Sequence, residues 1–171
     1  YATAAPELKD AMDLAYLTGQ RPADVRLMRE DDVEGVYLVV NQGKTSKRLR
    51  ILMEMDGQKN SLGLLIDRIK KRTAHLGSKY LIVNSYGKKV SPRMLGRRWD
   101  DARSAAVEAA NADGDPGLAD RISKFQFRDI RPKAASEISN IADASLLLGH
   151  SKEGITERVY RRVGAIAKPS K

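Results

Sequence analysis

Residues 18–25 are Thr18-Gly19-Gln20-Arg21-Pro22-Ala23-Asp24-Val25, and they join two helical patterns near the start of the 171-residue sequence. The preceding segment, Pro6 to Leu17, has apolar residues at helical spacing, and proline is tolerated in the first turn of a helix. Thr18-Gly19 ends this pattern, and Pro22 begins a second helix predicted over Pro22–Met28. Arg21 therefore stands at a junction between two helices, with an acidic residue three positions after it.

A β-hairpin is predicted after this junction. Val36–Val40 is rich in β-branched and aromatic residues, and Arg48–Met53 alternates in polarity, so each is a predicted strand. The residues between them favour a turn, which places Lys44 at or near the tip of the hairpin.

The rest of the chain is predicted to be mainly helical. Tyr80–Val83 is a predicted third strand, and Asn111–Gly117 is the strongest break in the chain. Helices are predicted over Asn60–His75, from Ser91-Pro92 onward, and over Phe127–Ser139, Asp143–Leu148 and Ile155–Val163. The sequence thus predicts a mixed α/β domain, mainly helical, with a small three-stranded antiparallel sheet.

Composition excludes several classes of site. The sequence has no cysteine and only two histidines, His75 and His150. Disulfides, thiol nucleophiles and cysteine-ligated zinc are therefore excluded, and no histidine-rich metal site is expected. The longest aliphatic runs are a few residues, such as Leu146–Leu148, far shorter than a membrane span.

Charge indicates a polyanionic partner. The net charge is +9 and the pI is about 9.8. Residues 44–98 carry 15 basic and 3 acidic side chains, so the excess is concentrated in the middle of the chain. Such a balance is typical of nucleic-acid-binding proteins, although a solvated lysine-rich face would give the same count. The run that contains Arg68, Lys70, Lys71 and Arg72 is open to both interpretations.

Polar residues suited to phosphodiester chemistry recur along the chain. Arg128-Asp129-Ile130-Arg131 places two arginines three apart at the start of a predicted helix, on one face. Leu148-Gly149-His150 lies at a helix end, and Tyr160 follows ten residues later among arginines. Arginine binds phosphate oxygens, lysine can donate a proton, and tyrosine can attack phosphorus.

Taken in order, these segments resemble the catalytic domain of the tyrosine recombinases, specifically phage-type integrases, from Leu8 to Arg162. By this resemblance Arg21 and Arg131 bind the scissile phosphate, and Asp24 orients the arginines without contacting the phosphate itself. Lys44 corresponds to the hairpin lysine that protonates the departing 5′-hydroxyl, with Lys47 as the alternative. Lys47 and Arg48 are also candidate DNA contacts.

The remaining site residues also follow from the resemblance. His150 is expected to donate a hydrogen bond to the phosphate, and Tyr160 to be the nucleophile that forms a 3′-phosphotyrosine. A helix cap for His150 and a core position for Tyr160 are the structural alternatives. The family usually has histidine at the position of Arg128, which leaves the group that takes the tyrosine proton open. Tyr160 lies ten positions after His150, where nine is commoner in the family.

The resemblance implies a function for the whole chain. Residues 1–171 are expected to be one C-terminal catalytic domain, and a separate N-terminal DNA-binding domain is expected outside this chain, which begins at Tyr1. The protein would integrate or excise a phage or genomic island. It would act as a homotetramer on double-stranded DNA, in the bacterial cytoplasm at the nucleoid. No metal or other cofactor is implied. The alternatives are a type IB topoisomerase and a non-catalytic DNA-binding protein with the same fold.

Overall fold

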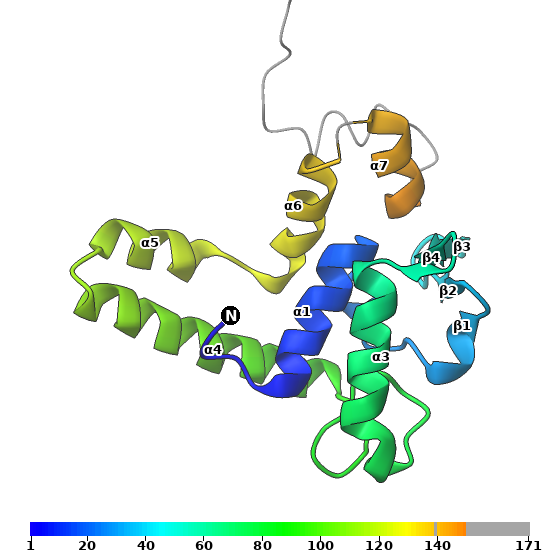
Figure 1. Ribbon diagram of the computed structural model, residues 1–171. Helices are drawn as coiled ribbons and strands as arrows, with labels where there is room; N and C mark the ends of the chain where they lie inside the picture. The colour runs from blue at the N-terminus through cyan, green and yellow to red at the C-terminus, as the bar shows by residue number, and fades with distance from the viewer. Residues whose placement is uncertain (139, 150–171) are drawn as a thin grey trace, which may run out of the picture.

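The computed structural model describes residues 1–138 and 140–149, so the predicted helix Ile155–Val163 lies outside the described residues (Figure 1). The α-helices in the described part are α1 (Pro6–Thr18), α2 (Pro22–Val25), α3 (Ser61–Thr73), α4 (Pro92–Ala112), α5 (Pro116–Lys124), α6 (Ile130–Ser136) and α7 (Ile141–Leu148). The strands there are β1 (Val33–Glu34), β2 (Tyr37–Asn41), β3 (Arg48–Leu52), β4 (Glu54–Met55) and β5 (Gln58–Lys59). Short 3₁₀ turns form η1 (Glu30–Asp32), η2 (Ala74–Leu76) and η3 (Phe127–Asp129). The prediction of a mainly helical α/β domain is confirmed.

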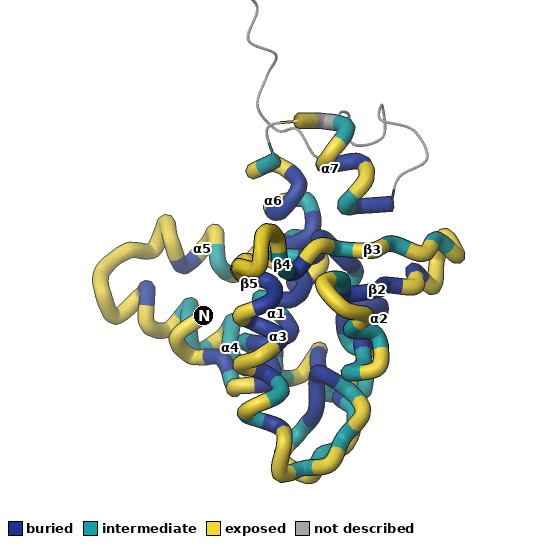
Figure 2. The backbone as a smooth tube through the Cα atoms, turned by 45° about the vertical axis from the view of Figure 1, so that its right-hand side comes forward, coloured by how far each residue is buried: buried dark blue, intermediate teal, exposed yellow. Residues whose placement is uncertain are grey.

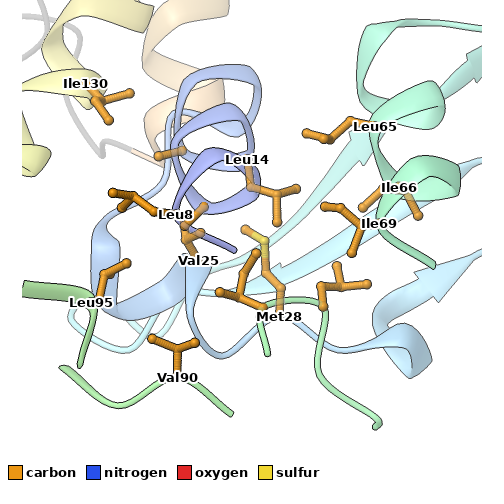
Figure 3. Packing of buried hydrophobic residues seen from close by; sticks show 14 of the residues in the cluster. Leu8, Leu14, Val25, Met28, Leu65, Ile66, Ile69, Val90, Leu95 and Ile130 are labelled. Carbon is orange, nitrogen blue, oxygen red and sulfur yellow. The ribbon is translucent and has the colours of Figure 1, made fainter. Parts of the chain in front are cut away.

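Helix α1 is the centre of the core. Its Leu8 and Leu14 are fully buried, and burying a leucine side chain stabilises a fold by about 1.5–3 kcal/mol. In Figure 3 these side chains lie between the apolar face of α3 and the residues around Leu95 of α4. Gly19 ends the helix in the left-handed conformation, at φ 63°. Because α1 packs against several other elements, it fixes the position of the loop that carries Arg21.

The sheet has the order β1-β2-β3 and is antiparallel throughout. Its third strand is β1, so the prediction that Tyr80–Val83 supplies it is wrong. Tyr80 and Val83 form only isolated bridges, with Arg29 and Lys89. Residues 81–83 are nevertheless fully buried, which accounts for their apolar, β-branched character without a place in the sheet.

Helices α4 and α5 form a pair that extends to one side of the molecule (Figure 1). Trp99 of α4 packs against Phe127 and Phe125, with ring centroids 5.3 and 5.9 Å apart. Residues 111–118, which span the end of α4, the connection and the start of α5, are exposed at the far end of the pair (Figure 2). Helix α5 is not among the predicted helices, although Asp115 caps its first turn by accepting a hydrogen bond from the N–H of Leu118 at 2.8 Å.

The last two predicted helices of the described part are both present with altered bounds, since α7 begins at Ile141 and not at the predicted Asp143. The predicted helix Phe127–Ser139 is instead the 3₁₀ turn η3 followed by α6. Helix α7 ends at Gly149, which has φ 65°, and the N–H of Gly149 donates to the carbonyl of Leu146 at 2.9 Å. In the described ranges, no helix combines the length and apolar character needed to cross a bilayer.

Candidate active site

Arg21 is placed by the turn between α1 and α2, where it is the N-cap residue of α2. Its Nη1 lies 3.9 Å from Oδ2 of Asp24, whose side chain is only 4% exposed. Neither of these two atoms has a hydrogen-bond partner among the described residues. The two groups therefore form a long ion pair without a direct hydrogen bond between these two atoms, and Nη1 itself is buried.

Lys44 lies exposed in the turn between β2 and β3, as predicted. The N–H of Gly43 donates to Oδ1 of Asp24 at 3.0 Å. One buried carboxylate thus contacts both the turn that carries Lys44 and the guanidinium of Arg21. Asp24 therefore links the Arg21 segment to the β2–β3 turn.

Arg131 is 5% exposed and reaches from α6 toward two backbone segments. Its Nη1 donates to the carbonyl of Gly19 at 2.5 Å, and its Nη2 donates to the carbonyl of Leu148 at 2.7 Å. Gly19 is two residues before Arg21, and Leu148 is two residues before His150. The buried guanidinium therefore joins the first arginine segment to the end of α7.

Arg128 has a different environment from Arg131, although the two are only three residues apart. It belongs to η3, and its side chain is exposed. Together with Arg21 and Arg26 it lines a pocket of about 650 Å³ between α2, η3 and the first turns of α4. The structure thus brings Arg21 and Arg128 to one pocket, with Trp99 and Phe127 in its wall.

The other predicted residues divide into two groups. His150 and Tyr160 lie outside the described residues, and their roles stay predictions. Lys47 is half-buried beside the turn, and Arg48 forms an exposed ion pair with Glu34, its Nη2 lying 2.9 Å from the Glu34 carboxylate. An exposed pair of this kind is worth little energetically, so it leaves Arg48 able to exchange partners.

Two residues that the sequence analysis did not select are buried at the centre of this arrangement. Gln20 and Gln42 are 0% and 1% exposed, and Nε2 of Gln42 donates to Oε1 of Gln20 at 2.7 Å. Gln20 occupies the variable position of the Thr-Gly-x-Arg segment, and Gln42 stands among turn-forming residues. No local pattern marks either residue, because their partners are far away in sequence.

The two arginines of the basic run on α3 are paired with acidic side chains of α1. Arg72 donates to Asp10 through Nε at 3.0 Å, and Arg68 donates to Asp13 through Nη2 at 2.6 Å. Burial raises the pKa of Asp10, and the two arginines oppose that rise. Arg68 and Arg72 therefore join α3 to α1. Within the run, Lys70 and Lys71 remain for a DNA-binding patch or a solvated helix face.

An exposed basic surface lies instead at the start of α4. Arg93 and Arg97 are exposed on its first two turns, beside Pro92 and Gly96, which line the pocket that holds Arg21 and Arg128. Ser91 caps this helix by accepting from the N–H of Met94 at 3.1 Å. The helix start and the pocket together can bind an extended polyanion along one face.

The arrangement suits a reaction at phosphorus. Asp24 contacts Arg21 and the turn that carries Lys44, and Arg131 donates to the carbonyl of Gly19, close to Arg21 in the chain. Guanidinium groups fixed in advance stabilise the charge that develops on phosphate oxygens in the transition state.

Comparison with known proteins agrees with this chemistry. A sequence model of the family described as "Phage integrase family" matches residues 2–165. The integrase of Escherichia phage HK022 is 27% identical over 154 residues, which make up 90% of this chain and 41% of that protein. The chain thus spans about two fifths of the length of that relative.

Solved structures show the same fold. The lambda integrase catalytic core has a TM-score of 0.59 and 25% identity, over 84% of this chain and 83% of that one. A lambda integrase dimer bound to a COC′ core site has a TM-score of 0.69 and 22% identity, over 98% of this chain and 46% of that one.

Proposed function

Because the chain belongs to the phage integrase family, we propose that it is the catalytic domain of a site-specific DNA recombinase. In this proposal residues 1–171 cut and rejoin DNA to integrate or excise a phage or genomic island, and an N-terminal domain outside this chain binds the core site. The protein acts as a homotetramer on two double-stranded DNA sites, in the bacterial cytoplasm at the nucleoid. The related lambda integrase has been solved as a tetramer bound to a Holliday junction, which supports this assembly.

The proposed reaction is an exchange of phosphate esters. The Tyr160 oxygen attacks the scissile phosphorus and loses its proton, while the bond from phosphorus to the 5′-oxygen breaks. Lys44 gives a proton to that 5′-oxygen, and the 3′-phosphate stays on Tyr160. Attack by the 5′-hydroxyl of another strand reverses these steps and rejoins the DNA. The bond energy is kept throughout, so the proposed reaction uses no metal, nucleotide or other cofactor.

Arginines stabilise the transition state of this reaction. Arg21 and Arg131 bind the non-bridging oxygens, and His150 donates a further hydrogen bond to them. Arg128 serves as a phosphate clamp and not as a base, because a guanidinium group donates hydrogen bonds and has no acceptor. Nearby positive charge favours the ionised form of a phenol, and in this proposal the Tyr160 proton passes to a phosphate oxygen or to water.

The observation that carries the proposal is the pair of contacts made by Asp24. Its carboxylate lies beside Arg21 and accepts from the N–H of Gly43, next to Lys44. A DNA phosphate bound by Arg21 would therefore meet a lysine on a turn held by the same carboxylate. Arg93 and Arg97 support the proposed course of the DNA backbone past the pocket.

The test is covalent capture on a suicide DNA substrate that carries candidate attachment sites. The protein should form a protein–DNA adduct that survives denaturation, and Tyr160→Phe should abolish the adduct while leaving DNA binding nearly unchanged. Tyr86→Phe is the matched control, because Tyr86 is 82% exposed and does not line the pocket of Arg21 and Arg128. An adduct that persists in Tyr160→Phe contradicts the assignment of the nucleophile.

Product analysis separates the alternative functions. Joined products between two DNA sites indicate a recombinase, whereas relaxation of supercoils without a second site indicates a type IB topoisomerase. DNA binding without any adduct in the unmodified protein would indicate a non-catalytic DNA-binding protein.

A further inference from the structure

Two buried glutamines connect the lysine hairpin to the end of α7. Gln42 uses both protons of its amide: Nε2 donates to Oε1 of Gln20 at 2.7 Å and to the carbonyl of Leu148 at 3.0 Å. Gln20 does the same, donating to the carbonyls of Thr18 and Leu147, both at 2.8 Å. Every donor of both amide groups is therefore satisfied inside the protein.

These bonds occupy carbonyls that a helix cannot satisfy by itself. The last carbonyls of an α-helix have no partner within the helix. Leu147 and Leu148 end α7, and their carbonyls accept from Gln20, Gln42 and Arg131. Figure 1 shows this end of α7 (orange) directed toward the end of α1 and the strands β2 and β3. Long polar side chains from the loop after α1, from the turn after β2 and from α6 therefore fix the end of α7.

The same Gln42 also organises the turn that carries Lys44. Its Oε1 accepts from Oγ1 of Thr45 at 2.5 Å, its N–H donates to the carbonyl of Lys47 at 2.8 Å, and its carbonyl accepts from the N–H of Ser46 at 2.9 Å. Together with the bond from Gly43 to Asp24, residues on both sides of Lys44 are tethered, while Lys44 itself is exposed.

We propose that Gln42 is a positioning residue, which sets the Lys44 turn at a fixed place relative to the end of α7. This inference rests on the proposed function, in which Lys44 protonates the departing 5′-oxygen. Proton transfer requires donor and acceptor within hydrogen-bond distance, and a misplacement of about 1 Å can cost a factor of about 100 in rate. Loss of the tether should therefore impair the protonation step more than any other.

The test compares two DNA substrates in single-turnover cleavage, one normal and one with sulfur at the 5′-bridging position. A thiolate leaves without needing a proton, so sulfur bypasses the contribution of Lys44. Gln42→Met keeps the volume of the side chain and removes its amide, and it should cleave the normal substrate about 10- to 100-fold more slowly. On the sulfur substrate its rate should return to within about threefold of the unsubstituted protein.

Exposed variants keep the test independent of folding. Thr45→Val removes the bond to Gln42 from a side chain on the surface, and should show a smaller loss with the same rescue by sulfur. Thr3→Val is its matched control, since Thr3 is also exposed and donates one bond, to the carbonyl of Ala102 at 2.9 Å, far along the chain from the turn. It should cleave both substrates at the unsubstituted rate.

The possible outcomes separate the two hypotheses. Equal losses on both substrates, or no loss on either, in Gln42→Met and Thr45→Val would overturn the role of Gln42 while leaving the recombinase proposal intact. Absence of any adduct in the unsubstituted protein would overturn the proposed function itself. In that case a double-mutant cycle still tests the contact between the two glutamines. The losses in free energy of unfolding caused by Gln20→Met and Gln42→Met should be non-additive.

Discussion

Replacing Gly149 by alanine should destabilise the protein more than the same change at Gly77. Both glycines end a helical segment in the left-handed conformation, with φ 65° and 58°. They differ in what a side chain would meet. A Cβ at Gly149 would lie 2.6 Å from Oε1 of Gln42, whereas nothing lies within 4 Å of a Cβ at Gly77.

The expected magnitudes follow from this difference. A non-glycine residue in the left-handed region costs about 1–2 kcal/mol, and this cost applies at both positions. At Gly149 the alanine must also displace Gln42, which donates two buried hydrogen bonds worth about 1 kcal/mol each. Gly149→Ala should therefore cost about 2–4 kcal/mol and Gly77→Ala about 1–2 kcal/mol.

Urea denaturation of both variants against the unsubstituted protein measures these free energies of unfolding. The gain from a stiffer unfolded chain is the same for both substitutions, so it cancels in the comparison. Equal losses for the two variants would refute the reasoning, because they would mean that Gln42 yields to a methyl group at no cost.

Other predictions concern the reaction and the charged clusters. Lys44→Ala should slow cleavage, and the 5′-bridging sulfur substrate should restore its rate. If sulfur rescues Lys47→Ala instead, the proton donor is Lys47 and not Lys44. Arg128→Ala should lose much more activity than Arg128→Lys in single-turnover cleavage, and Arg128→His should stay active with a new pH dependence near the histidine pKa; wild-type rates in Arg128→Ala would exclude a role. Because burial raises the pKa of Asp10 in the folded state, its contribution to stability falls as pH rises through that pKa. Between about pH 4 and about pH 7, the free energy of unfolding of Asp10→Asn should therefore rise relative to that of the unsubstituted protein, as measured by urea denaturation. A difference that does not change with pH would contradict this. The chain alone should bind DNA at roughly 10⁻⁴–10⁻⁶ M with steep salt dependence, which fluorescence anisotropy measures; tight, salt-insensitive binding would contradict it.

Local patterns in the sequence account for most of the elements and for the order of the candidate site. Periodicity and Pro6 predict α1, and turn residues predict the hairpin with Lys44 between its strands. The Arg21 segment falls at the predicted junction of α1 and α2, and the segment that contains Arg131 begins a helix. These signals work because each depends on residues within a few positions of one another.

Tertiary structure alone decided which polar groups meet. Residues 81–83 have the apolar, β-branched character of a strand because they are buried. The third strand of the sheet is nevertheless β1. Arg68 looks like part of a DNA-binding face, and it pairs with Asp13, 55 positions earlier in the chain. Gln42 looks like a turn residue, and its amide caps a helix 106 positions later. A buried amide or guanidinium binds whichever carbonyl or carboxylate the packing of apolar faces brings to it, and that choice is absent from any local window of the sequence.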